Sequence, residues 1–371
     1  MEAQLEERTQ RCQEQLVKQD ADAVILSMSS NLHFLTGFTD EPMERHLLCF
    51  VPSDGDPVYV VPEMYENQIQ TESWVEDIRT WSDDTGPTTI LESTIEELSL
   101  DGGSVLLDDT MQARFVLDLQ KYLPNTSFAR AEHIFSPLRM QKDETELKHL
   151  QHASNIADQV SEEIRSLGSD AVGLTERELA KRIRKDLLAE EGEELGFQTI
   201  VGSGENGAHP HHRVSDRVIE AGDPVVLDFG VTINGYSSDQ TRTVVFSGEP
   251  PIGFIEVYDV VRAALDAGFQ TVKPGVTAGQ VDKAVRDIFE QHGFAEKFVH
   301  RTGHGVGLDI HEPPYIVNGN ETELQPGMVF SIEPGAYLKD QWGIRIEDLV
   351  VVTPDGCHRL NDSPRTWRPL D

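Results

Sequence analysis

The stretch DPVVLDFGVTINGYSSDQTRTVVF, residues 223–246, decides the fold of the C-terminal part of the chain. Its two β-rich arms flank Asn234-Gly235, a dipeptide that strongly favours a two-residue hairpin turn. With that turn Gly230 faces Asp239. Asp228 is two residues before Gly230, so its side chain lies on the same face of the hairpin as that of Asp239. Asp228 and Asp239 are then diagonal neighbours, about 7–8 Å apart at the backbone. Their carboxylates could meet over a cation.

A second pair of strand-like segments repeats this arrangement. MVFSIEP (328–334) and WGIRIEDLVVVT (342–353) alternate apolar residues with one inward acid each, Glu333 and Glu347. An unpaired carboxylate in an apolar interior is heavily penalised, so these acids need compensation. One solution is ion pairing with an arginine that is close in sequence; Arg242 and Arg345 are the candidates.

The segment HRTGHGVGLDIHEPP, residues 300–314, contributes three histidines. Glycines flank His304, and glycine is chosen where the chain turns tightly or another group approaches closely. Arginine pairing is an adequate explanation for one buried acid, but not for four acids and a glycine-flanked imidazole. Two aspartates, two glutamates and one imidazole form a ligand set suited to a pair of borderline divalent ions.

Size, cysteines and charge limit the possible partners. The 371 residues suffice for two domains. Three scattered cysteines without a CxxC pair argue against a disulfide framework and favour a reducing cytoplasm. With 65 acidic and 31 basic residues, the formal net charge of -34 would repel nucleic acid and anionic lipid. No apolar run reaches membrane-spanning length, and we expect no targeting segment.

The helix and strand patterns predict two domains, residues 1–137 and 138–371. In the first, ADAVILSM, HLLCFVP, PVYVVP and SVLLDD have strand length and ARFVLDLQKYL is spaced as a helix, which indicates an α/β domain. A long helix with an apolar stripe begins after Asp143, which can form a capping box with Glu146. Further capping boxes are expected at Thr175 and Thr277.

Five motifs carry a family resemblance. Asp228, Asp239, His304, Glu333 and Glu347, in the contexts LDFG, SSDQTRT, GHGVGL, IEPG and RIED, resemble the metal ligands of the pita-bread metallopeptidases. The match spans about residues 145 to 360. The first 135 residues, with SSNLHFLTGF, are similar to the N-terminal domain of the prolidase, aminopeptidase P and creatinase branch. The resemblance implies an α/β N-terminal domain followed by an α+β pita-bread catalytic domain.

The resemblance also implies roles for residues around the ligands. His211 and His311 match histidines that contact the scissile amide, and His300 matches a position that lines the pocket. Arg345 resembles an arginine that steadies the ligand carboxylates, while His212 has no counterpart and is expected to be a loop residue. Glu333 is expected to bind metal and to carry a proton toward the leaving nitrogen.

The resemblance further implies hydrolysis between an N-terminal residue and proline with two divalent ions, and so oxygen-rich a ligand set favours Mn²⁺ or Co²⁺ over Zn²⁺. Dipeptides or short peptides containing proline are the expected substrates, and a cytoplasmic homodimer is the expected form. We place Xaa-Pro dipeptidase ahead of Xaa-Pro aminopeptidase, although Tyr315 stands where some prolidases carry arginine. A non-catalytic binding member of the fold is the remote alternative, but such a member should lack a ligand and none is missing.

The acidic composition generates a prediction about salt. Ten of the 31 basic residues are lysine, and the acids are spread through both halves, as in a protein from a halophile. The Debye length falls from about 30 Å at 0.01 M salt to about 3 Å at 1 M, so salt should relieve self-repulsion. We expect the thermal unfolding midpoint to rise steadily from about 0.1 to about 3 M KCl with metal kept saturating. A flat profile would contradict this interpretation.

Overall fold

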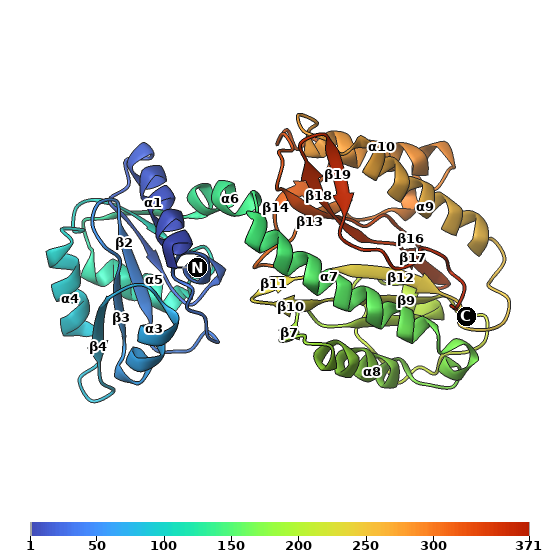
Figure 1. The fold of residues 1–371 in the computed structure, drawn as a ribbon, viewed down its shortest axis with the longest axis horizontal. Coiled ribbons are helices and arrows are strands. Elements are labelled where there is room, and N and C mark those ends of the chain that lie inside the picture. Colours follow the sequence, from blue (N-terminus) through green and yellow to red (C-terminus); the bar gives the residue numbers. More distant parts are fainter. Residues whose placement is uncertain (1, 371) are drawn as a thin grey trace. The chain divides into compact units, whose positions relative to one another are not determined.

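The computed structural model describes residues 2–370, which form two compact units that divide after Arg139. Helix α6 (Glu132–Met140) includes this division and also the expected one between residues 137 and 138 (Figure 1). Within residues 2–370, none of the helices combines the length and apolar character that a membrane span requires.

A mixed six-stranded sheet forms the core of the N-terminal unit. Its strand order is β4-β3-β2-β1-β5-β6, antiparallel between β1, β2 and β3 and parallel elsewhere. The strands are β1 (Ala23–Leu26), β2 (Leu48–Pro52), β3 (Val58–Pro62), β4 (Asp77–Trp81), β5 (Ser104–Leu107) and β6 (Ser127–Arg130). The four apolar runs identified in the sequence are β1, β2, β3 and β5, which confirms the α/β prediction.

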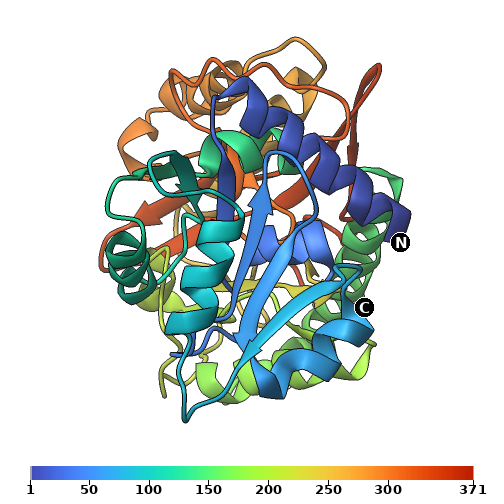
Figure 2. The same ribbon diagram turned by 90° about the vertical axis from the view of Figure 1, so that its left-hand side faces the viewer.

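Helices flank this sheet. They are α1 (Glu2–Lys18), α2 (Ser30–Thr36), α3 (Glu66–Glu72), α4 (Thr88–Glu97) and α5 (Ala113–Tyr122), with the short 3-10 helix η1 (Glu63–Tyr65). In Figure 2 this unit faces the viewer, and helix α1 is visible, which packs against β1 and β2. Phe115 and Leu119 of α5 enter the same apolar cluster as Ile25 and Phe50 of the sheet.

Four long helices support the C-terminal unit. They are α7 (Glu144–Arg165), α8 (Glu176–Ala189), α9 (Phe254–Thr271) and α10 (Ala278–Gln291), with short 3-10 helices η2 (Gly168–Ala171), η3 (Gly204–Ala208) and η4 (Ala295–Lys297). All three expected capping boxes are present, at Asp143, Thr175 and Thr277. Each satisfies backbone N–H groups that a helix start leaves unbonded.

The strands of this unit form four small sheets. Their orders are β11-β10-β7, β12-β9-β8, β14-β13-β15-β18-β19 and β16-β17. The strands are β7 (Glu194–Leu195), β8 (Ile200–Ser203), β9 (Val225–Phe229), β10 (Val231–Ile233), β11 (Tyr236–Ser237), β12 (Gln240–Val244), β13 (Gly303–Gly305), β14 (Glu312–Ile316), β15 (Val329–Ile332), β16 (Gly335–Leu338), β17 (Trp342–Arg345), β18 (Asp348–Thr353) and β19 (Gly356–Arg359).

The hairpin of residues 223–246 has the register that a two-residue turn dictates. Asp228 lies opposite Thr241, and Ile233 lies opposite Tyr236. The turn residues Asn234 and Gly235 have φ values of 48° and 77°. Both positive values are typical of the type I′ turn that joins twisted strands. The sequence prediction of this hairpin is therefore confirmed.

The segment 342–353 was expected to be one strand arm, and this prediction is wrong. Its first part is β17, which pairs with β16, and its last part is β18, which pairs with β15. The chain changes sheets around Glu347, whose N–H donates to the Thr241 carbonyl of β12 at 3.1 Å. This change of partner brings Glu347 beside the hairpin that carries the two aspartates.

Two apolar clusters hold the C-terminal unit together. One packs α7 and α8 against β8, β9 and β12, and the other packs α9 and α10 against strands that include β15, β17 and β18. In Figure 1 the helix pairs lie on opposite sides of the strands. The polar residues described next therefore emerge from strands whose other faces are buried under helices.

Candidate metal centre

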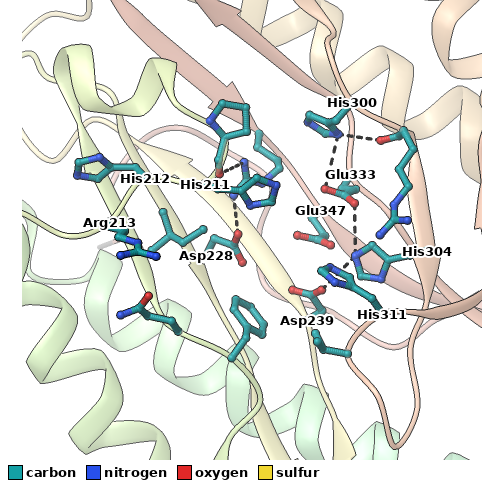
Figure 3. A pocket seen from close by; sticks show the side chains of 17 residues that line it. His211, His212, Arg213, Asp228, Asp239, His300, His304, His311, Glu333 and Glu347 are labelled. Carbon is teal, nitrogen blue, oxygen red and sulfur yellow. Dashed lines mark hydrogen bonds and ion pairs between the residues drawn. The ribbon is translucent and has the colours of Figure 1, made fainter. Parts of the chain in front are cut away.

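A pocket of about 630 Å³ in the C-terminal unit gathers every site residue that the sequence predicted. The nine residues are Asp228, Asp239, His304, Glu333, Glu347, His211, His300, His311 and Arg345. Figure 3 shows the acids and His304 directed toward one common space, although they come from separate strands.

The five expected ligands occupy strands or strand ends. Asp228 is in β9, Asp239 directly precedes β12, and His304 is the middle residue of β13. Glu333 follows β15, and Glu347 lies between β17 and β18. Backbone hydrogen bonds in the sheets fix these positions, so the side chains are brought together before any ligand binds.

The glycines around His304 allow its strand to pack closely on both sides. A Cβ atom on Gly303 would lie 1.8 Å from the Ser331 carbonyl oxygen, and one on Gly305 would lie 2.3 Å from the Pro313 carbonyl oxygen. Both distances are far below van der Waals contact. Side chains at these positions would push β13 away from its neighbours and displace His304.

His304 is held as a neutral imidazole with one nitrogen facing the acids. Its Nδ1 donates to the Gly305 carbonyl at 3.2 Å, while Nε2 lies 3.4 Å from Glu333 Oε1 and 3.7 Å from Asp239 Oδ2. Burial, with the charges of His311 and Arg301, lowers the pKa of His304 to about 3. The Nε2 lone pair is therefore available in the tautomer that a metal ligand requires.

The donor set fits divalent cations. Ligand atoms of Asp239, His304 and Glu347 lie within 4.8 Å of one another. Asp228 Oδ1 and Glu347 Oε1 are buried, yet neither has a hydrogen-bond partner among residues 2–370. Burial and mutual repulsion raise the pKa of Asp239 and Glu333 well above the ordinary range, and that of Glu347 to about 7. Bound cations would satisfy the unbonded oxygens and offset the repulsion.

Arginine pairing accounts for one of the four acids. Arg345 Nη2 donates to Asp228 Oδ2 at 2.5 Å, and Arg345 Nε donates to the Thr241 hydroxyl at 3.1 Å. Thr241 in turn donates to Glu347 Oε2 at 2.7 Å. Arg242 pairs instead with Asp348 at 2.7 Å. Arg345 thus orients two acids and leaves their outer oxygens free, whereas Arg242 contacts none of the four carboxylates.

Tyr337 is a part of the site that the sequence did not indicate. Its hydroxyl accepts a hydrogen bond from Arg345 Nη1 at 2.8 Å and contacts His300 Nε2 at 2.9 Å. His300 Nδ1 donates to the Arg301 carbonyl at 2.7 Å, so both ring nitrogens are occupied. Burial lowers the pKa of His300 to about 3. His300 lines the pocket as predicted, but its nitrogens bind the protein itself.

Glu176 is a second residue that the sequence did not indicate. It is fully buried at the start of α8, and its carboxylate accepts hydrogen bonds from Ser203, Asn206, His212 and Ser215. Burial opposes its charge, but these hydrogen bonds outweigh burial and lower its pKa to about 2. His212 is therefore bound to Glu176, and the loop that presents the neighbouring His211 is fixed.

His211 and His311 are the histidines with free ring nitrogens. Both are exposed in the pocket, and neither ring has a hydrogen-bond partner within residues 2–370. The His311 ring meets the His304 ring edge-on, with centroids 4.1 Å apart and planes at 87°. These two imidazoles are placed to donate a hydrogen bond to a molecule in the pocket.

Comparison with known proteins gives the same assignment for both units. The model for metallopeptidase family M24 matches residues 148–354, and that for the creatinase/prolidase N-terminal domain matches residues 8–141. A recombinant prolidase from Thermococcus sibiricus superposes with a TM-score of 0.93 at 37% identity, covering 98% of each chain. The expected fold, a creatinase/prolidase-type domain followed by a pita-bread domain, is confirmed.

Two curated relatives extend the comparison along the chain. A probable dipeptidase PepE of Mycobacterium bovis is 38% identical over 348 residues, covering 92% of this chain and 90% of the relative. An Xaa-Pro dipeptidase of Lactobacillus helveticus is 34% identical over 351 residues, covering 93% of this chain and 94% of the relative. The similarity therefore includes both units.

The raised pKa values generate a prediction about metal binding. With the pKa of Glu347 near 7 in the metal-free protein, this carboxyl holds its proton below that pH and must lose it when a cation binds. We expect Mn²⁺ binding to release protons at about pH 6.5, and affinity to rise with pH. Calorimetry in buffers of different ionisation enthalpy measures the release. Binding without proton release would show that these acids are already ionised.

Proposed function

The chain belongs to metallopeptidase family M24, and we propose that it is a dinuclear-metal Xaa-Pro dipeptidase, which cleaves the bond between an N-terminal residue and proline. The observation that carries the proposal is the set of four carboxylates, three of them buried, around one neutral imidazole. Relatives named Xaa-Pro dipeptidase and prolidase, similar over nearly the whole chain, support it.

Five residues would hold the two cations: Asp228, Asp239, His304, Glu333 and Glu347. Ligand atoms of three of them, Asp239, His304 and Glu347, lie within 4.8 Å of one another. Four carboxylates against one imidazole favour Mn²⁺ or Co²⁺ over Zn²⁺. When bound, the cations polarise the scissile carbonyl and lower the pKa of water enough to supply hydroxide at neutral pH.

The chain's own residues then perform the proton transfers and hydrogen bonding. Proline leaves as a secondary amine whose nitrogen carries no proton in the peptide, so a proton must be delivered to it. Glu333, on the pocket wall, would take the proton that the attacking water gives up and deliver it to this nitrogen. A histidine with a free ring nitrogen, His211 or His311, donates to the carbonyl oxygen as negative charge develops.

The buried side chains of Arg345 and Tyr337 hold these residues in position. Arg345 holds Asp228 directly and Glu347 through Thr241, and it also donates to the Pro210 carbonyl at 3.1 Å. Pro210 immediately precedes His211, so one guanidinium links two acids to the histidine loop. Outer hydrogen bonds of this kind orient ligands and tune their basicity.

The proposal also covers the length of the substrate, the cellular compartment and the assembly. Xaa-Pro aminopeptidase, acting on longer peptides, is the second candidate because Tyr315 replaces an arginine found in some prolidases. The cysteines are all free thiols, which suits a reducing cytoplasm. A homodimer is the proposed assembly.

The function is tested by comparing three substrates with the metal-saturated protein in concentrated KCl. A proline dipeptidase hydrolyses Ala-Pro and leaves both Ala-Ala and Ala-Pro-Ala largely intact. The rate of amine release, measured by chromatography of the products, gives kcat/KM for each substrate. Preference for Ala-Pro-Ala would establish the aminopeptidase instead. Activity on none of the three, with metal bound, would contradict the proposed function.

His311→Ala tests the role of a free imidazole. We expect kcat for Ala-Pro to fall by roughly 10²–10³ because a donor to the developing oxyanion is lost. Metal content should be unchanged, since His311 is outside the ligand set. His292→Ala is the matched control, because His292 lies at the end of α10 and bonds only to its own helix. Loss of metal with unchanged kcat per bound ion would assign His311 to metal binding.

A further inference from the structure

Arg301 is a pocket arginine that forms no ion pair within residues 2–370, although its positive charge acts on the nearby Glu333. The pocket contains three arginines, Arg213, Arg301 and Arg345. Arg345 is buried and its guanidinium is fully engaged with protein oxygens. Arg301 is half-buried, and its guanidinium forms no ion pair or hydrogen bond with any residue from 2 to 370. In a chain with 65 acidic and 31 basic residues, a half-buried guanidinium without a carboxylate is unexpected.

The guanidinium is nevertheless fixed in place. Its carbon lies 4.5 Å from the centre of the Tyr315 ring, a cation–π contact. The Arg301 carbonyl accepts from His300 Nδ1 at 2.7 Å, and the next residue, Thr302, donates its N–H to the Ile316 carbonyl at 2.9 Å. Backbone and side chain are therefore both held against the strand that carries Tyr315.

A guanidinium that is held against an aromatic ring by a cation–π contact still has N–H groups available for hydrogen bonds. Those groups form a planar fork that matches a carboxylate in two parallel hydrogen bonds. Because Arg301 lines the pocket, the groups are within reach of a bound molecule. Arg301 thus has the features of a preorganised carboxylate receptor: a fixed position, free donors and partial burial.

The charge of the pocket makes such a receptor necessary for an anionic group. Two divalent cations would balance the four carboxylates of Asp228, Asp239, Glu333 and Glu347 in the same cavity, so a substrate carboxylate needs a counter-charge of its own. Arg345 is committed to Asp228, and Arg213 is exposed, so it is more strongly hydrated. Arg301 is therefore the guanidinium best placed to offset an incoming negative charge.

We propose that Arg301 binds a carboxylate of the peptide substrate through its in-plane N–H groups while its face remains on Tyr315. The proposal rests on the proposed function and specifies how the site selects its substrate. Two carboxylates are possible sources: the C-terminal carboxylate of proline in a dipeptide, or an acidic side chain on the residue before proline. Both would use the same hydrogen bonds, and substrates that lack one or the other distinguish them.

The test compares Arg301→Leu and Arg301→Lys with wild type on Ala-Pro, the C-terminal amide of Ala-Pro, and Glu-Pro, with Mn²⁺ saturating. Arg368→Leu is the matched control, since Arg368 is an exposed arginine whose guanidinium lies 5.0 Å from the Trp367 ring centre, outside the pocket. It loses the same charge and the same kind of aromatic contact. Metal content and thermal midpoint are measured for every variant, so that a folding defect is recognised.

If proline's carboxylate is the ligand, Arg301→Leu lowers kcat/KM for Ala-Pro by about 10²-fold, mainly through KM, and leaves the amide within about twofold of wild type. If an acidic side chain is the ligand, Arg301→Leu lowers kcat/KM for Glu-Pro but not for Ala-Pro or its amide. Arg301→Lys keeps the charge without the planar fork and should recover part of the activity. Either pattern supports the proposal.

Equal losses on all three substrates, or no loss on any, would overturn the role of Arg301 even if the protein is an active dipeptidase. Loss of metal in Arg301→Lys would likewise overturn it and assign the residue to the metal centre. Failure of the proposed function has a different signature, because wild type would then hydrolyse none of the three peptides.

Discussion

Four carboxylates, three of them buried, lie beside one imidazole and repel one another, and the arrangement of the pocket depends on that repulsion. Burial and neighbouring charge raise the pKa of Asp239, Glu333 and Glu347, while burial keeps His304 neutral. A divalent cation reverses this balance because it stabilises the ionised acids and binds the free imidazole nitrogen. Cation binding, acid ionisation and the integrity of the pocket are therefore linked.

The structure holds these groups from outside the pocket. Arg345 reaches Asp228, and through Thr241 it reaches Glu347. Tyr337 connects Arg345 to His300. A separate carboxylate, Glu176, fixes the loop that carries His211. Each of these contacts satisfies a buried polar group and leaves the oxygens and nitrogens that face the cavity free. Chemistry in the pocket thus depends on residues that need not touch a substrate.

Local patterns in the sequence predicted the hairpin register, the capping boxes, and the four acids and His304 that meet in the pocket, whereas His211, His300 and His311 were assigned through the family resemblance. Asn234-Gly235 fixes its register within a few residues, and a capping box spans one helical turn, so no distant information is needed. The strand change near Glu347 depends on Thr241, which is 106 residues away in sequence. Glu176 bonds to residues 27 to 39 positions away, Tyr337 contacts His300, 37 positions away, and a single buried Glu or Tyr gives no periodic signal. Tertiary contacts of this kind become visible only in the folded chain.

The central claim is that the carboxylate cluster is a two-cation site and not a cluster of protonated acids. The most direct measurement is anomalous X-ray diffraction at the manganese edge from crystals grown with Mn²⁺. The account predicts two anomalous peaks within the carboxylate cluster, one of them beside His304 Nε2. A single peak elsewhere in the pocket, or no peak at saturating Mn²⁺, would contradict it.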